Sequence, residues 1–160
     1  VYAGRMDKSK GVQEIIDLLK EIRKTYDIEL TLIGNNSEHF KLSEGLDWIH
    51  AMPSVPRKDL PSELVKHEVF IHNFIGSLDK VLIENVMLRM PIITSNLEFA
   101  NTFDLFSKPP RMNLHDQIIG YLESDSASIN TMLEKNYQNA LQNHNLLAWI
   151  NKLTAVINQA

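Results

Sequence analysis

The chain opens with Val1-Tyr2-Ala3-Gly4-Arg5, which is followed by Lys10-Gly11 and a long amphipathic stretch. Residues 1–3 predict a buried strand, and Gly4 permits a sharp turn where that strand ends. Apolar side chains then recur at helical spacing, at Val12, Ile15, Ile16, Leu19 and Ile22. This period predicts a helix over residues 10–25, so the chain begins with a strand, a turn and a helix.

Short apolar runs and amphipathic stretches alternate over the rest of the chain. The apolar runs predict strands at residues 28–33, 48–51, 69–72 and 91–95. The amphipathic stretches predict helices at residues 60–66, 78–89, 113–123, 127–143 and 145–158, with Ser77 as the N-cap of the helix at 78–89. Strands separated by helices pair in parallel, and strands without polar alternation are covered on both faces. We therefore predict one α/β domain over residues 1–160: a Rossmann-like, doubly wound parallel sheet with helices on both faces and a helical C-terminal segment.

The composition is that of an ordinary globular domain, with 160 residues, 44% hydrophobic residues and a net charge of -4. This charge, without a basic stripe, argues against a nucleic-acid partner. The absence of cysteine excludes disulfides, thiolate metal sites and cysteine nucleophiles, and the histidines have no metal-ligand spacing. The chain starts inside a strand and without methionine, so we expect a fragment of a larger protein whose other domain is missing.

Ligands of a doubly wound sheet bind beyond the carboxyl ends of its strands. The residues expected there are Gly4-Arg5, Gly34-Asn35-Asn36, His72-Asn73 and Ser95-Asn96. Lys10 and Lys80 stand at predicted helix starts, although the positive end of a helix dipole disfavours a cation. Their positions favour an anionic ligand, a phosphate or diphosphate, on which Arg5, Lys10 and Lys80 converge. For Arg5 the alternative is a surface ion pair with Asp7, and for the lysines it is an ordinary surface position.

Several stretches follow one another in an order that is typical of one enzyme family. Residues 4–11 (GRMDKSKG) are similar to its motif GR-[LM]-x-x-x-KG, and residues 30–34 (LTLIG) to its second strand and glycine turn. Val55 with Asp59-Leu60-Pro61 is similar to its V-x-x-x-(D/E)-L-P connection. Residues 69–96 resemble its pattern V-F-[IV]…LEAMA-x-G-x-PVI-x-S, and Trp149 resembles its C-terminal tryptophan. Over essentially its whole length, the chain resembles the C-terminal, donor-binding half of a GT-B glycosyltransferase of the group 1 (family 4) type.

The resemblance implies roles for the charged residues. Arg5 and Lys10 would grip the diphosphate of a nucleotide sugar and stabilise its departure, which makes them the catalytic residues. Glu84, as the second glutamate of the family's E-x7-E motif, would accept hydrogen bonds from the ribose hydroxyls. Gly76 stands where the first glutamate belongs, and Asp79-Lys80 matches the members that carry a DK dipeptide in this loop. Lys80 would be a further phosphate contact, and Asp79 a sugar or lysine contact.

The resemblance places further residues at the same donor site: Gly4, Gly34, Asn35, Val55 and Val81. Residues 52–56 would lie beside the base. Gly76 and Ser77 would offer backbone N–H groups to a phosphate, and the alternative is that Ser77 is a simple N-cap. His72 would touch the sugar or the diphosphate, and the alternative is a satisfied structural histidine.

The resemblance implies a retaining enzyme without a metal or other cofactor. Its substrates would be a UDP- or GDP-linked sugar and a glycan or lipid-linked acceptor, in surface polysaccharide (capsule, lipopolysaccharide or O-antigen) biosynthesis. It also implies a missing N-terminal acceptor-binding domain, a cytoplasmic location, peripheral at the inner face of the membrane through that domain, and an inactive isolated fragment. A dinucleotide oxidoreductase is excluded because no G-x-G-x-x-G follows the first strand. A non-catalytic α/β module that binds a nucleotide or a partner stays open, because the first motif glutamate is absent.

Overall fold

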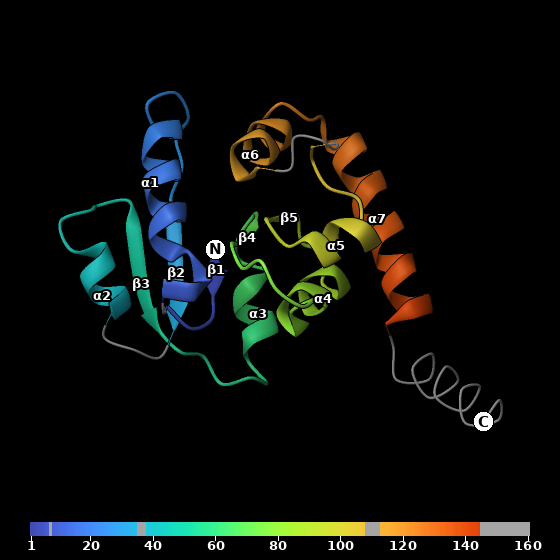
Figure 1. Ribbon diagram of the computed structural model, residues 1–160, viewed down its shortest axis with the longest axis horizontal. Coiled ribbons are helices and arrows are strands. Elements are labelled where there is room, and N and C mark those ends of the chain that lie inside the picture. Colours follow the sequence, from blue (N-terminus) through green and yellow to red (C-terminus); the bar gives the residue numbers. More distant parts are fainter. Residues whose placement is uncertain (7, 35–37, 108–112, 145–160) are drawn as a thin grey trace.

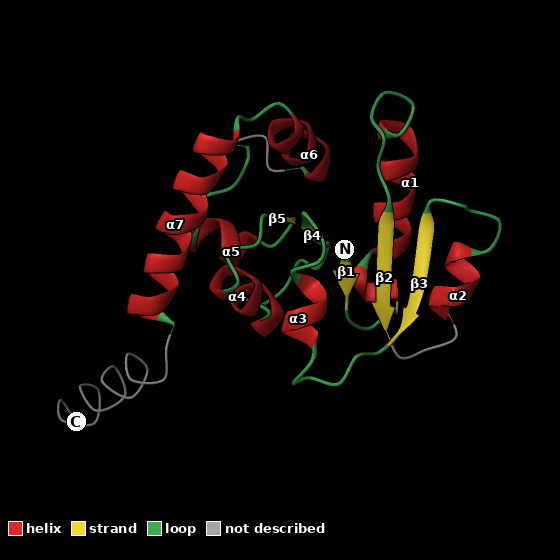
Figure 2. Cartoon of the chain, turned by 180° about the vertical axis from the view of Figure 1, so that it is seen from behind, coloured by secondary structure: helices red, strands yellow, loops and turns green. Residues whose placement is uncertain are grey.

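The computed structural model describes residues 1–6, 8–34, 38–107 and 113–144 (Figures 1 and 2). Its strands are β1 (Tyr2–Ala3), β2 (Leu30–Gly34), β3 (Ile49–Pro53), β4 (Phe70–His72) and β5 (Ile92–Thr94). Among them β1 pairs with β2, β2 with β3, and β4 with β5, and each pair is parallel. The Ile71 N–H donates to the Val1 carbonyl over 2.9 Å, which sets β4 beside β1. The strands therefore lie in the order β3-β2-β1-β4-β5, that of a doubly wound sheet.

Helices connect the strands. They are the 3-10 turn η1 (Lys8–Lys10), α1 (Val12–Ile22), α2 (Glu38–Ser43), α3 (Leu60–Leu64), α4 (Lys80–Met87), α5 (Leu97–Thr102), α6 (Leu114–Leu122) and α7 (Ser126–Asn143). The predicted strands and helices within the described residues are confirmed, with ends that shift by at most about three residues. Sequence reasoning missed α2 and α5, which are helices of 6 residues each. The predicted helix at 145–158, with Trp149, lies outside the described residues.

The core lies on both faces of the sheet, because successive strand residues point to opposite sides. On one side the sheet packs against α1 and α6 through Tyr2, Leu30, Leu32, Ile71 and Ile93. On the other side it packs against α3, α4, α5 and α7 through Ala3, Ile33, Phe70 and Ile92. This two-sided core confirms the predicted fold class and explains why the strands are apolar without alternation.

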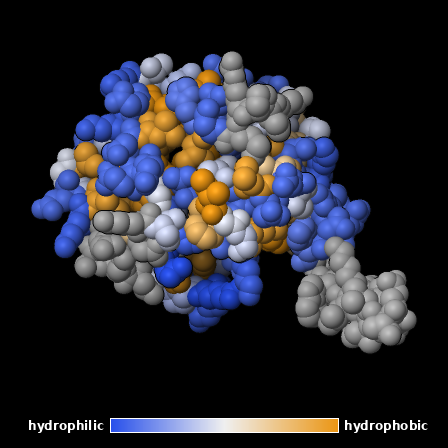
Figure 3. All heavy atoms as spheres, viewed as in Figure 1, coloured by the Kyte–Doolittle hydropathy of each residue, from blue (hydrophilic) through white to orange (hydrophobic). Residues whose placement is uncertain are grey.

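Coverage of the first side is incomplete. A hollow lies between α1 and α6, and its lining includes Leu19 from α1, Ile118 from α6, and Ile71 and Ile93 from the sheet. Apolar atoms are visible between these two helices in the space-filling view (Figure 3). The segments that lead into β2 and β4, residues 27–29 and 66–69, also line the hollow. It therefore lies toward the amino ends of the strands, opposite the predicted ligand edge.

An unusual turn follows α4 at Arg89, whose φ is 53°. This left-handed conformation is sterically unfavourable for residues other than glycine. Arg89 Nε donates to Glu134 Oε2 over 2.8 Å, and its guanidinium lies 3.5 Å from the centroid of the Tyr137 ring. Both partners belong to α7, so contacts with that helix offset the cost of the turn.

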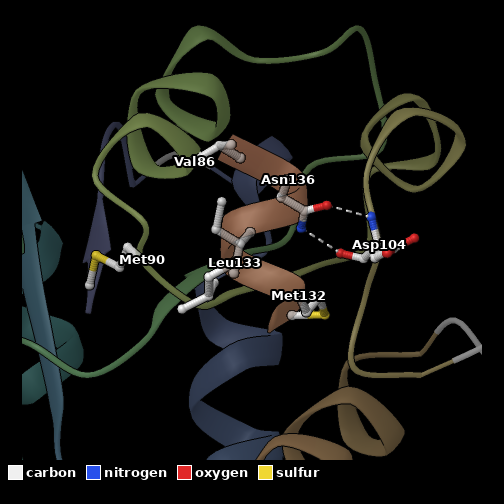
Figure 4. Close-up of a pocket in the computed structure, with 7 residues that line it drawn as sticks. Val86, Met90, Asp104, Met132, Leu133 and Asn136 are labelled. Atoms are coloured by element: carbon white, nitrogen blue, oxygen red, sulfur yellow. Dashed lines mark hydrogen bonds between the residues drawn. The ribbon is translucent and has the colours of Figure 1, made fainter. Parts of the chain in front are cut away.

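A buried amide attaches α7 to the segment that follows α5. Asn136 accepts from the Asp104 N–H over 2.9 Å and donates to the Asp104 carbonyl over 3.0 Å. Figure 4 shows these bonds at a small pocket lined by Val86, Met90 and Leu133, among others. The amide thereby satisfies two backbone groups that belong to no helix or strand.

We expect Asn136→Leu to lower the free energy of unfolding by about 2–4 kcal/mol, because leucine keeps the volume but leaves two backbone groups without a partner. Urea denaturation measures this change. The matched control is Asn143→Leu at an exposed position of the same helix, where we expect a change within about 0.5 kcal/mol. Equal effects of the two substitutions would contradict the role given to the Asn136 amide.

Candidate functional site

The ends of β4 and β5 and the start of α1 meet at one edge of the sheet, where Asn73 joins them. Asn73 Nδ2 donates to the Gly11 carbonyl over 3.2 Å, and its Oδ1 accepts from the Ser95 hydroxyl over 2.8 Å. Gly11 has φ 59°, and a Cβ there would lie 2.3 Å from Asn73 Nδ2, so glycine is required. A Cβ at Gly34 would likewise lie 2.8 Å from the Gly4 carbonyl oxygen. The loop after β1 is thus packed closely against the ends of its neighbouring strands.

Lys10 is held at this edge by two contacts. Its Nζ lies 2.9 Å from Asp79 Oδ2 and 3.6 Å from the centroid of the Phe74 ring. The Lys10 side chain is only 12% exposed, which is unusual for lysine. Of the two contacts predicted for Asp79, a sugar or a lysine, the structure shows the lysine.

His72, which is itself buried, binds the same oxygen of this carboxylate. Its Nε2 lies 3.0 Å from Asp79 Oδ2, and its Nδ1 lies 3.0 Å from Thr94 Oγ1. Because a carboxylate only accepts, Nε2 carries the proton and Nδ1 accepts from the Thr94 hydroxyl. Burial lowers the pKa of His72, and the Asp79 carboxylate compensates only in part. Burial would raise the pKa of Asp79, but the hydrogen bonds from Lys10 and His72 together bring it below its ordinary value.

Two fully buried polar residues support His72. The Gln117 side chain donates to the Thr94 carbonyl over 2.8 Å and accepts from the Thr94 N–H over 3.0 Å. The Asn96 N–H donates to Thr94 Oγ1 over 3.1 Å. Sequence reasoning missed Thr94 and Gln117, although Gln117 precedes Ile118 on the buried face of a predicted helix. A polar residue on the buried face of a helix needs a buried hydrogen-bond partner. This requirement could have identified Gln117 from the sequence.

One buried amide shapes the loop between β4 and α4. Asn96 Nδ2 donates to the carbonyls of Phe74, Gly76 and Ser77 over 3.1, 3.1 and 3.2 Å, and its Oδ1 caps α5 by accepting from a backbone N–H. These bonds hold the loop outside the helix, so α4 begins at Lys80 and its N-cap residue is Asp79. The predicted N-cap role of Ser77 is therefore wrong.

Gly76 is constrained by the same loop. A Cβ at Gly76 would lie 2.4 Å from the Phe74 ring. Any side chain at this position would displace Phe74, which is the ring that contacts Lys10. The glutamate that the resemblance expects at Gly76 is therefore incompatible with the present position of Phe74.

Glu84 lines an open groove between α3 and α4. Its Oε1 lies 2.6 Å from Nη2 of Arg57, and both side chains reach solvent. Lys80 lines the same groove, whereas Lys10 is held by Asp79 and the Phe74 ring. The rest of the lining is mostly apolar and includes Leu60, Leu64, Leu78, Ile83 and Met87. The two lysines that were predicted to converge therefore occupy different settings, and the partner of Glu84 was not predicted.

The remaining predicted positions are placed as follows. Arg5 is exposed at the end of β1, and its alternative partner Asp7 lies outside the described residues, as does Asn35. Val55 and Val81 are partly buried against the core cluster on the α4 side of the sheet. Within the part of the chain that the structure describes, no three or more His, Cys, Asp or Glu side chains are grouped to hold a metal ion. None of the described helices is both long enough and apolar enough to cross a membrane.

We expect Asn96→Asp to lower the free energy of unfolding by about 2–3 kcal/mol. Aspartate keeps the oxygen that caps α5, but it loses the donor and sets a charge against three carbonyl oxygens. Urea denaturation measures the loss, and amide hydrogen exchange should show faster opening at residues 74–77. The control is Asp125→Asn at the N-cap of α7, with an expected change within about 0.5 kcal/mol. Unchanged exchange in the loop would contradict the role of the amide.

The lowered pKa of His72 predicts how stability varies with pH. The unfolded chain, with a histidine pKa of about 6.5, binds a proton that the folded chain takes up only at lower pH. The free energy of unfolding should therefore fall as the pH is lowered from about 7 to about 5. His67 contributes in the same direction, because burial also lowers its pKa. Denaturation across this range should show a smaller slope for His72→Gln than for wild type, and an unchanged slope would contradict the role given to burial of His72.

The chain has counterparts among known protein families and solved structures. No curated protein matches it. Among solved structures, the chain is similar to Anabaena HepE in complex with UDP and glucose, with a TM-score of 0.75 and 12% identity over 99% of this chain and 47% of that chain. At this identity the likeness concerns the fold, and the chain spans about half the length of HepE. Residues 1–102, well over half of the chain, match the family model described as glycosyl transferases group 1, and the chain therefore belongs to that family.

Proposed function

We propose that this chain is the donor-binding half of a retaining glycosyltransferase of the hexosyltransferase class. It binds a UDP- or GDP-linked sugar, and the full protein transfers the sugar to a glycan or lipid-linked acceptor that an N-terminal domain holds. The reaction belongs to surface polysaccharide biosynthesis (capsule, lipopolysaccharide or O-antigen) at the cytoplasmic face of the membrane. Family membership supports glycosyl transfer, and the UDP complex of the structural neighbour supports a nucleoside diphosphate as the ligand.

The observation that carries the proposal is the fixed position of Lys10. A lysine with 12% exposure sits where β4 ends and α1 begins, in the part of a doubly wound fold that receives ligands. An ammonium group has three N–H donors, and Asp79 and the Phe74 ring occupy only part of this capacity. The remaining capacity suits an anionic oxygen of a diphosphate.

The chemistry follows from where charge develops. As the glycosidic bond breaks, negative charge builds on the departing diphosphate, and fixed cations stabilise that charge more in the transition state than in the ground state. Arg5 supplies a planar, bidentate donor and Lys10 a point charge. Together they take the role that a metal ion has in other transferases, so the proposal requires no cofactor.

Glu84 binds the ribose in this proposal, and residues 52–56 lie beside the base. The Glu84 carboxylate now accepts from Arg57 through Oε1, and its second oxygen stays available as an acceptor. Lys80, in the same groove, contacts a phosphate. The groove between α3 and α4 thereby continues the donor site beyond the diphosphate position.

Isothermal titration calorimetry with UDP and GDP tests the proposal. We expect one of them to bind with a dissociation constant of about 1 mM or below, and Arg5→Ala and Lys10→Ala each to weaken binding about tenfold or more. Lys20→Ala, an exposed lysine of α1, is the matched control and should bind as wild type does. Addition of EDTA should change nothing, and the chain alone should transfer no sugar.

A non-catalytic module remains the second candidate because Gly76 replaces the first motif glutamate. The same titration separates the donor site from a module that binds only a protein partner. A module that only binds a protein partner gives no heat with either diphosphate, and this outcome would overturn the donor-site proposal. Sugar transfer by the chain alone would overturn the assignment to half of an enzyme.

A further inference from the structure

We propose that His72 is the positioning residue of Lys10: acting through the Asp79 carboxylate, it holds the lysine ammonium beside the place of the donor diphosphate. This inference rests on the proposed function and adds a residue to it. His72 does not touch the ligand, since it is 3% exposed and lies behind Asp79. His72 holds the Asp79 carboxylate in place, and that carboxylate in turn holds the Lys10 ammonium.

The first step of the argument is that a single oxygen is shared. Asp79 Oδ2 accepts from Lys10 Nζ over 2.9 Å and from His72 Nε2 over 3.0 Å. Among the described residues, Lys10 and His72 are the side chains that donate to this carboxylate, and of the two only His72 is fixed in the core. Because both donors meet at one oxygen, any rotation of Asp79 that loses His72 also displaces the acceptor of Lys10.

The second step is that His72 itself cannot turn. Its Nδ1 contacts Thr94 Oγ1 over 3.0 Å, and the Thr94 backbone is held on both its N–H and its carbonyl by Gln117. Rotation of the imidazole would break the hydrogen bonds of both buried ring nitrogens, to Thr94 Oγ1 and to Asp79 Oδ2, which is costly. The rigid reference point for Lys10 is therefore the end of β5 and the α6 helix that covers it.

The third step concerns what pre-positioning achieves. A free lysine side chain has four rotatable bonds, and ordering it on ligand binding opposes affinity. Asp79 and the Phe74 ring order Lys10 before the ligand arrives, so the bound diphosphate meets a cation that is already in place. Without the His72 hydrogen bond, Asp79 is less ordered and so is Lys10. The entropy of ordering the lysine is then lost when the ligand binds, which weakens binding.

The fourth step is the charge of the group. With His72 neutral, the negative Asp79 balances the positive Lys10, and the trio carries no net charge. Among the described residues, Asp79 and Lys10 are the charged groups that face His72, because β5 and α6 present only the neutral Thr94 and Gln117. A proton on His72 adds one positive charge to the trio, so a diphosphate binds more tightly as the pH falls.

Titration calorimetry with UDP, or with GDP if that is the diphosphate that binds, tests the inference at pH 6, 7 and 8. We expect His72→Phe to weaken binding about tenfold at pH 7, because phenylalanine fills the space but cannot donate to Asp79. His72→Gln restores a donor that does not titrate, so it should recover most of this loss. The ratio of wild-type to His72→Gln affinity should rise about threefold from pH 8 to pH 6, and protonation of the diphosphate itself cancels in that ratio. His50→Gln is the control, and urea denaturation of each variant shows that it is folded.

The outcomes distinguish the proposed role of His72 from the proposed donor site. If wild type binds and Lys10→Ala does not, while both His72 variants bind as wild type does at every pH, the role of His72 is overturned and the donor site stands. If the folded His72→Phe binds as His72→Gln does, the role of the donated hydrogen bond is likewise overturned. If wild type binds no diphosphate, or Lys10→Ala leaves binding unchanged, the donor site itself is overturned and the inference falls with it.

Discussion

Parallel pairing of short strands is the constraint on which the rest of this structure depends. Between two parallel strands the chain must run back across one face of the sheet before it enters the next strand. The carboxyl ends of the strands therefore all lie at the same edge of the sheet. Side chains of adjacent strand residues, such as Phe70 and Ile71, then enter two different cores. The helices are required to cover those cores, and the loops that carry Lys10, Asp79 and Asn96 are brought together as a consequence.

The polar groups at this edge form one connected set, because burial leaves them no alternative. His72, Thr94, Gln117 and Asn96 are all nearly or fully inaccessible to water, and each has partners within the set. An unpartnered polar group in such a place costs about 1–3 kcal/mol, so the members constrain one another. The site is therefore stiff at its base, around β5, and exposed only at Asp79 and beyond.

Sequence reasoning predicted the fold well because the signals for it are local and repeated. The apolar period from Val12 to Ile22 and the apolar run at β4 each carry enough residues to identify one element. Lys10 was singled out through its place at the start of a predicted helix, where the helix dipole disfavours a cation. The contacts of the site were harder to predict: Arg57 meets Glu84 across 27 positions, and the Ser77 carbonyl is bound by the side-chain amide of Asn96, the N-cap residue of α5. Such choices depend on which side chains the topology brings together, and neither spacing nor propensity encodes them.

The left-handed turn at Arg89 bears on how this chain can diverge. Its backbone conformation favours glycine, yet the residue is an arginine, whose side chain bonds Glu134 and stacks on Tyr137 of α7. Replacement of Arg89 by any residue other than glycine keeps the strain and loses both contacts, and replacement of the two partners leaves the strain unopposed. We therefore expect changes at these positions to be paired, so that Arg89 and Glu134 co-vary across 45 residues of sequence.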